Sequence, residues 1–322
     1  MALREEQWPA LPLSEWRDTC ETLQLWTQIV GKIRLTLSPW INHSWHAPLY
    51  VTAAGLTTSP IPYGTRTFEI EFDFLAHELL IRVSTGERRA LPLREETVSE
   101  FYRMLMRELE TLDIYIHINT HPNEVEHPIP FANDMLHKSY DPLFARRFFQ
   151  VLAQADRLLQ TFRARFIGKN SPVHFFWGSF DLAVTRFSGR PAPSHPGGIP
   201  NLPDWVVREA YSHEVSSAGF WPGGGPLPYP LFYSYAYPEP PGFRTGAELP
   251  EGAFYSEELH EFVLPYDAVR HSDHPDDTVL AFLQGTYEAA ARLGHWDNTL
   301  DFNFRPRHFT RTGSSRAEHR GI

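Results

Sequence analysis

The chain has 322 residues, of which 42% are hydrophobic, and it includes 9 Trp, 13 Tyr and 23 Phe. This composition predicts a globular protein with a large core and argues against extended disorder. The formal net charge of −10 at pH 7 disfavours nucleic acid as a partner, because contact with a phosphate backbone requires clustered positive charge.

Two further features narrow the class of protein. The first residues lack the basic flank and apolar core of a signal peptide, and the chain has no run of about 18 apolar residues, the length a membrane-spanning helix needs. We therefore expect a cytoplasmic protein with no membrane partner. Cys20 is the only cysteine, so an intrachain disulfide and a cysteine-cluster metal site are excluded, and we expect Cys20 to lie in the core.

In the first half, the pattern predicts a helix, then strands, then another helix. Apolar residues recur at steps of three and four from 16 to 37, which predicts an amphipathic helix that Pro39 ends. From Phe68 to Phe74 apolar residues alternate with acidic ones, which predicts a strand with one buried face. A further helix is expected over 95–112.

The second half repeats this order after a segment, 122–130, with three prolines. A helix is expected over 144–166 and a strand over 174–187 (HFFWGSFDLAVTRF). The motif ALPL at 90–93 corresponds to VLPY at 263–266, and each precedes a predicted helix. Such internal similarity indicates a duplicated supersecondary unit.

We therefore predict an α+β fold made of two divergent copies of a helix–antiparallel strands–helix unit, packed as a pseudo-twofold globule. The repeats are expected at 1–121 and 141–304, joined by a connector at 122–140 and followed by a flexible tail at 305–322. The second repeat differs by long loops rich in Pro, Gly and aromatic residues at 188–252, and loops of this length are often functional.

The densest polar cluster lies in the second repeat and supplies the candidate catalytic residues: His174, Asp181, Arg186, His213 and Glu214. A histidine paired with a carboxylate can act as general acid and base, and an arginine can hold an anionic group. Candidate substrate-binding residues near them are Trp177, Tyr211, Ser216 and Trp221. The opposing interpretation is that these polar groups only satisfy one another inside a Trp-rich sheet.

Strand alternation groups some of these side chains. If 174–187 is one strand, Trp177, Ser179 and Asp181 share one face, whereas His174 and Arg186 share the other. The same rule separates His213 from Glu214. A neighbouring strand could bring His213 to His174 or to Asp181, and the sequence does not decide between them.

Sixteen histidines raise the alternative of a metal centre. The cofactor is unknown from the sequence, and a divalent metal ion is one candidate: His46, His174 and His213, with Glu214 beside them, would suit non-haem iron, zinc or copper if both repeats meet there. The pairs His43/His46 and His117/His121 are weaker signals, because nearby prolines make a helical geometry doubtful.

Other catalytic templates are absent from the sequence. It contains no G-x-G-x-x-G, no Walker loop, no G-x-S-x-G and no H-E-x-x-H. Lys32 and Lys169 lie at matching places near the ends of the two long predicted helices, where a cation offsets the helix dipole.

The segments SPVHFFWGSFDLAVTRFSGR, REAYSHEVSSAGFWPGG, FEIEFDF and the opening WPALPLSEWRDTCETLQLWTQIVGKIRL resemble a bacterial family known as DUF5996, a domain of unknown function. The resemblance runs to about Asp301 and implies no activity, cofactor or catalytic residue.

Two functions stay open from the sequence. One is a small-molecule enzyme whose site uses the second repeat's polar cluster, walled by Trp and Phe. The other is a non-catalytic module that binds a ligand or a protein segment in the same aromatic cleft. The reaction, the substrate and the oligomeric state are not indicated.

Overall fold

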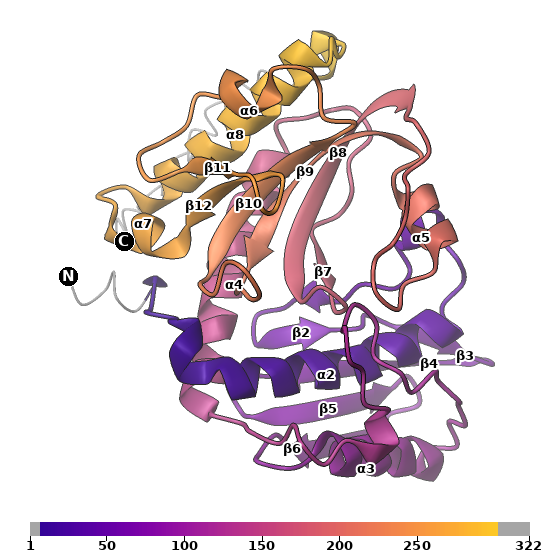
Figure 1. The fold of residues 1–322 in the computed structure, drawn as a ribbon. Helices are drawn as coiled ribbons and strands as arrows, with labels where there is room; N and C mark the ends of the chain where they lie inside the picture. Colours follow the sequence, from indigo (N-terminus) through magenta and orange to yellow (C-terminus); the bar gives the residue numbers. More distant parts are fainter. Residues whose placement is uncertain (1–6, 302–322) are drawn as a thin grey trace, which may run out of the picture.

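A computed structural model describes residues 7–301 and has an α+β architecture with two six-stranded antiparallel sheets. Figure 1 shows one sheet in each half of the molecule, with the long helix α2 (Leu13–Leu37) running across the first. No helix in the described part is long and apolar enough to cross a membrane.

The first half runs from α2 through a short helical turn, η1 (Asn42–Ser44), into the first sheet and then into α3 (Val98–Thr111). Its strands are β1 (Tyr50–Val51), β2 (Gly55–Thr57), β3 (Ile61–Tyr63), β4 (Arg66–Asp73), β5 (Glu78–Val83) and β6 (Arg88–Pro92). They pair in the order β1-β2-β4-β5-β6, with β3 also on β4.

The helices α2 and α3 pack against the aromatic face of β4. Trp26 of α2 stacks on Phe101 of α3 at 4.6 Å between ring centroids, and Phe101 in turn stacks on Phe72 of β4 at 6.4 Å. The α3 start is fixed by a capping box between Thr97 and Glu100, which satisfies backbone N–H groups that the first turn leaves unpaired.

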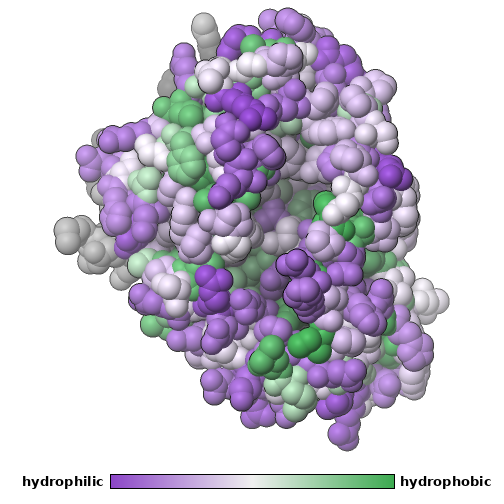
Figure 2. All heavy atoms as spheres, in the orientation of Figure 1, coloured by the Kyte–Doolittle hydropathy of each residue, from purple (hydrophilic) through white to green (hydrophobic). Residues whose placement is uncertain are grey.

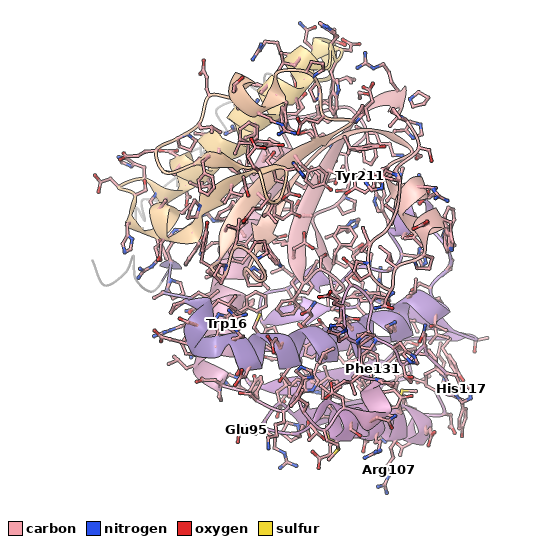
Figure 3. All side chains as sticks on the ribbon, viewed as in Figure 1. Trp16, Glu95, Arg107, His117, Phe131 and Tyr211 are labelled. Carbon is pink, nitrogen blue, oxygen red and sulfur yellow. The ribbon has the colours of Figure 1, made fainter. Side chains whose placement is uncertain are left out.

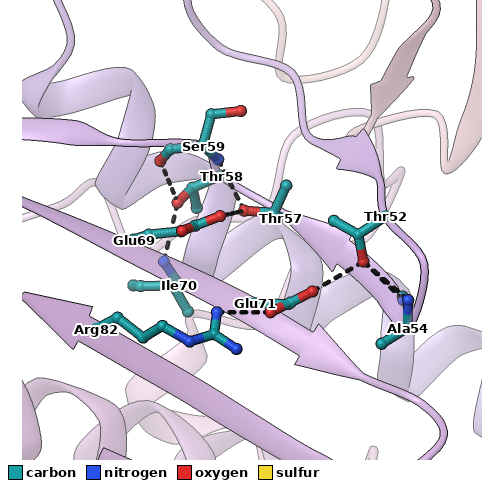
Figure 4. A network of polar contacts seen from close by, with 10 residues as sticks. Thr52, Ala54, Thr57, Thr58, Ser59, Glu69, Ile70, Glu71 and Arg82 are labelled. Carbon is teal, nitrogen blue, oxygen red and sulfur yellow. Dashed lines mark hydrogen bonds and ion pairs between the residues drawn. The ribbon is translucent and has the colours of Figure 1, made fainter. Parts of the chain in front are cut away.

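The opposite face of β4 is polar, as its alternation predicts, and Figure 4 shows how its carboxylates are held. Glu71 receives hydrogen bonds from Thr52 Oγ1 at 2.8 Å and from Arg82 Nη1 at 2.6 Å. Thr57 donates to Glu69 on the same face. This pairing allows the Glu71 side chain to be buried although it is charged.

A short helical turn, η2 (Phe131–Asn133), lies in the connection to the second half, which begins with α4 (Pro142–Arg163). The second sheet consists of β7 (His174–Phe176), β8 (Asp181–Pro191), β9 (His213–Trp221), β10 (Leu231–Tyr237), β11 (Phe254–Ser256) and β12 (Glu261–Pro265). Its order is β11-β12-β10-β9-β8-β7.

The second half also contains α5 (Asp204–Ala210), α6 (Phe243–Gly246), α7 (Tyr266–His271), α8 (Pro275–Leu293) and the turn η3 (Asn298–Leu300). Contacts of α4 with β8 and of α8 with β10 place these two helices on one face of the sheet. The other face is turned toward the first half.

The two halves join through their backbones and a shared core. Leu49 and Phe175 exchange two backbone hydrogen bonds of 2.9 Å, and the Trp177 indole donates to Ala47 O at 2.9 Å. Buried residues of both halves form one continuous hydrophobic cluster. The halves therefore pack as one body.

The predicted α+β class is confirmed, and Cys20 lies in the core. The order helix, antiparallel sheet, helix occurs in both halves, but the pseudo-twofold duplication and its domain boundaries stay predictions. The tail at 305–322 lies outside the described residues.

Two segments differ from the sequence prediction. The strand expected over 174–187 is a hairpin, because the chain reverses between β7 and β8 and Phe180 adopts a positive φ of 61° in the turn. The segment 188–252, expected as long loops, supplies the end of β8 and all of β9 and β10. Its aromatic residues alternate along β10, and this pattern is typical of a strand.

Candidate functional site

A cavity of about 540 Å³ lies between the two halves. Its lower wall is formed by α2, η1 and the segment 119–124, and its upper wall by β7 to β10 and α5. In Figure 2 the surface is hollowed between these halves. In Figure 3, Tyr211 marks the upper wall, and Phe131, below α2, marks the lower half.

The walls are largely aromatic. Phe176, Trp177 and Phe187 line the cavity, and Trp40 and Trp205, which also line it, keep 57% and 59% of their surface exposed. A pocket with apolar walls and a few convergent polar groups is typical of a small-molecule site.

Asp181 is the central polar group of the cavity. The residue is 7% exposed, and its carboxylate receives hydrogen bonds from the Ser179 and Tyr233 hydroxyls. Burial raises the pKa of Asp181, although both hydrogen bonds act in the opposite direction. Gly219 makes this arrangement possible, because a Cβ there would lie 2.6 Å from the Tyr233 hydroxyl.

A second carboxyl, Glu124, lines the same cavity from the connecting segment. Burial, and secondarily the charge of Asp181, raise the pKa of Glu124 to about 7. Glu124 packs directly on the turn before Asp181, since a Cβ on Gly178 would lie 2.0 Å from Glu124 Oε1. The same two causes raise the pKa of Glu261, which lies on β12 and does not line the cavity, to about 8. The site therefore holds a proton near neutral pH.

Hydroxyl groups extend from these carboxyls across the upper wall. The Tyr211 and Tyr235 hydroxyls are hydrogen-bonded at 2.7 Å, and those of Thr185 and Ser217 at 2.9 Å. All four residues line the cavity. Tyr211, predicted to bind substrate, thus lies in the wall.

Lys32 supplies an amine to the lower wall. It is only 4% exposed, and its Nζ donates to His121 O at 2.8 Å and to the side-chain oxygen of Asn123. Burial lowers the pKa of Lys32 to about 8. Its side chain thus lies in the cavity wall and is hydrogen-bonded to the connecting segment. The predicted role of Lys32, offsetting the dipole at a helix end, does not account for these contacts.

His43 lies at the junction of η1 and α5. Its Nε2 faces Lys169 Nζ at 2.6 Å, and its Nδ1 lies 3.1 Å from Glu209 O. An ammonium group can only donate, so Nε2 accepts and Nδ1 carries the proton. Burial and the Lys169 charge lower the pKa of His43, which favours this neutral form.

The histidines predicted to act in catalysis or metal binding are dispersed. His46 lines the cavity and accepts a hydrogen bond from the Ile41 N–H at 3.2 Å. His174 is fully buried between the rings of Trp45, Tyr50 and Phe176. Burial lowers the pKa of His174 to about 3, so it stays neutral.

The expected face-sharing of His174 and Arg186 is not observed, because of the hairpin turn. His174 pairs with Ala183 and so lies on the cavity face of the sheet, whereas Arg186 lies on the opposite face. The Arg186 guanidinium is 3.5 Å from the Phe162 ring centroid and donates to Phe162 O. Arg186 therefore packs between the sheet and α4, away from Asp181. Ser216, its partner across the strands, shares that face.

His213 and Glu214 begin β9 and lie beside the end of β8 that is far from Asp181. His213 is paired with Pro191, the last residue of β8, so it meets neither His174 nor Asp181. Glu214 forms an ion pair with Arg190 at 2.6 Å. Trp221 lines a smaller neighbouring cavity beside α2, which shares Glu124 and Ser179 with the first.

Within residues 7–301 no three His, Cys, Asp or Glu side chains come together in a way that could hold a metal ion. The set predicted for a metal, His46, His174 and His213, is thus not assembled.

Of the predicted site residues, Asp181, Trp177, Tyr211 and His46 line the cavity, whereas the others do not. The sequence prediction missed Glu124, Tyr233, Tyr235 and Lys32. Tyr233 and Tyr235 are two residues apart on one strand, so strand alternation could have placed both on the same face. Glu124, in an irregular connection, carried none.

A family model described as a family of unknown function (DUF5996) matches residues 8–301. No curated protein and no solved structure matches the chain.

Proposed function

Because the chain belongs to the DUF5996 family, whose function is unknown, we propose its function from the cavity: it is an enzyme that transforms a small molecule between the two halves. The observation that carries the proposal is the carboxyl pair Asp181 and Glu124, which lines an aromatic cavity and has raised pKa values.

The chemistry follows from the protonation of this pair. A carboxyl with a pKa of about 7, such as Glu124, can both donate and accept a proton at neutral pH, which is the requirement for general acid–base catalysis. Asp181 is oriented by Ser179 and Tyr233, so its carboxylate has a fixed direction. In this proposal Glu124 transfers the proton and Asp181 tunes its pKa.

Untargeted turnover measurements test this function even while the substrate is unidentified. Purified protein is incubated with a small-molecule metabolite extract, and mass spectrometry follows which compounds disappear and form. We expect the wild type to consume at least one compound and Glu124→Gln to lose that consumption by about 100-fold or more, the scale of general acid–base catalysis.

The matched control is Glu214→Gln, which removes a carboxylate ion-paired to Arg190 outside the cavity. It should turn over like the wild type. Equal consumption by Glu124→Gln and the wild type would show that Glu124 is not the catalytic group.

A second candidate function, a non-catalytic binding module, is favoured by Trp40 and Trp205. Their exposed indoles line the cavity and offer apolar surface to a ligand or a protein segment. Retention of a compound by the wild type without any chemical change would support this function over the enzyme.

A further inference from the structure

Lysine is rare in this chain: only Lys32, Lys138 and Lys169 occur among its 322 residues. Lys138 is exposed, whereas Lys32 is buried and lines the cavity. The Lys32 Nζ lies 5.8 Å from the Trp177 ring centroid and 6.0 Å from that of Phe131. The one buried lysine is thus placed at the proposed reaction site.

The hydrogen bonds of Lys32 do not require a charged amine. Both acceptors, His121 O and Asn123 Oδ1, are neutral oxygens. A neutral amine has two N–H groups, so these two acceptors satisfy both and leave the nitrogen lone pair free. Burial is the cause of the lowered pKa of about 8. At pH 7 roughly one Lys32 side chain in ten is therefore unprotonated, against roughly one in three thousand for an ordinary lysine.

We propose that Lys32 is a nucleophile that forms an imine with an aldehyde or ketone bound in the cavity. The inference rests on the proposed function and names its substrate class: a carbonyl compound with an apolar or aromatic body, which Trp177 and Phe176 would contact.

The step balances without an oxidant or reductant. The amine nitrogen bonds to the carbonyl carbon, and the carbonyl oxygen becomes a hydroxyl. The two amine protons leave with this oxygen as water when the carbon–nitrogen double bond forms. Loss of water needs an acid, and the Asp181–Glu124 pair holds a proton in the same cavity.

Reductive trapping tests the inference directly on the full chain. The protein is incubated with benzaldehyde and sodium cyanoborohydride at pH 7, and peptide mass spectrometry measures the rate of benzylation at each of the three lysines. We expect Lys32 to react at least about ten times faster than Lys138, with this ratio shrinking as the pH rises toward 10. Reaction at Lys32 no faster than at Lys138 at pH 7 would overturn the inference.

Two variants give matched controls. Lys32→Arg keeps a cation that can bond to His121 O but has no nucleophilic amine, so benzylation should persist only at the other lysines. Lys138→Arg should leave the Lys32 rate unchanged. The wild-type rates decide the inference even if Lys32→Arg does not fold.

The outcomes separate the two proposals. Trapping at Lys32 without any metabolite turnover would retain the inference about the amine and contradict the enzyme function. Turnover that needs Glu124, with no preferential trapping at Lys32, would retain the enzyme and overturn the imine.

Discussion

At the scale of single residues, the cavity concentrates groups whose burial shifts their protonation toward the neutral form. Asp181 and Glu124 have raised pKa values and Lys32 has a lowered one. Burial is the largest cause in each case, because a charge loses hydration there. Perturbed groups gathered in one cleft are a physical signature of a reactive site.

Glu124 also carries a prediction about stability and pH. Its folded pKa of about 7 lies above the ordinary value of 4.5. The stabilisation from its protonated form is fully present below pH 4.5 and is lost as the pH rises through 7. Glu124→Gln keeps the neutral form at every pH, so urea unfolding should show it about 1–3 kcal/mol more stable than the wild type at pH 8.5 and nearly equal at pH 4.

The control for this experiment is Glu214→Gln, whose carboxylate is ion-paired and should give no gain at high pH. A loss of stability in Glu124→Gln of the same size at both pH values would contradict the assigned protonation.

At the scale of elements, α5 closes one side of the cavity through contacts with η1. Glu209 Oε1 accepts from the His43 N–H at 2.6 Å, and Glu209 O is close to the His43 ring. The helix spans only Asp204–Ala210, and a helix this short depends on tertiary contacts for its stability.

Glu209→Ala should loosen this wall. Loss of a hydrogen bond to a charged acceptor costs about 1.5–3 kcal/mol, so amide hydrogen exchange should accelerate by about tenfold or more in 204–210 and 42–44, and not in β9 or β10. Arg208→Ala on the same helix removes an exposed pair with Asp204 and a long, exposed hydrogen bond to His195 O, and it should change little. Unchanged exchange in Glu209→Ala would mean that other contacts hold α5.

The long helices were the most predictable elements. Apolar spacing predicted helices over 16–37 and 144–166, and they form at Leu13–Leu37 and Pro142–Arg163. The reversal within 174–187 was missed because no proline marks it, and the continuous strand then placed His174 on the wrong face. One hairpin turn thus changed which residues could meet.

The candidate site was only partly predictable for a related reason. Asp181 and Trp177 stood out by residue type and alternation, and both line the cavity. Glu124 and Lys32 come from the first half and its connection, so only the packing of the two halves brings them to Asp181. The antiparallel pairing of β9 with β8 likewise places His213 far from Asp181.

At the scale of the whole molecule, the site exists only where the two halves meet. One hydrophobic cluster spans both halves, and the Leu49–Phe175 backbone pair joins their sheets. Neither half alone has both walls of the cavity. Folding and site formation are therefore expected to be coupled.

This coupling predicts a single cooperative unfolding transition. Urea unfolding followed by near-ultraviolet circular dichroism and by tryptophan fluorescence should give coincident curves, because separation of the halves would expose their common core. Two resolved transitions would instead indicate that the halves are stable independently.

The central claim is that Asp181 and Glu124 form one coupled carboxyl pair in the cavity. The most direct test is a carboxyl ¹³C NMR titration of Glu124, assigned by the signal missing in Glu124→Gln, in the wild type and in Asp181→Asn. We predict a wild-type pKa of about 7 for Glu124. This pKa should fall in Asp181→Asn, because the variant removes the Asp181 charge that helps to raise it. A wild-type value near 4.5, or one that Asp181→Asn leaves unchanged, would contradict the claim.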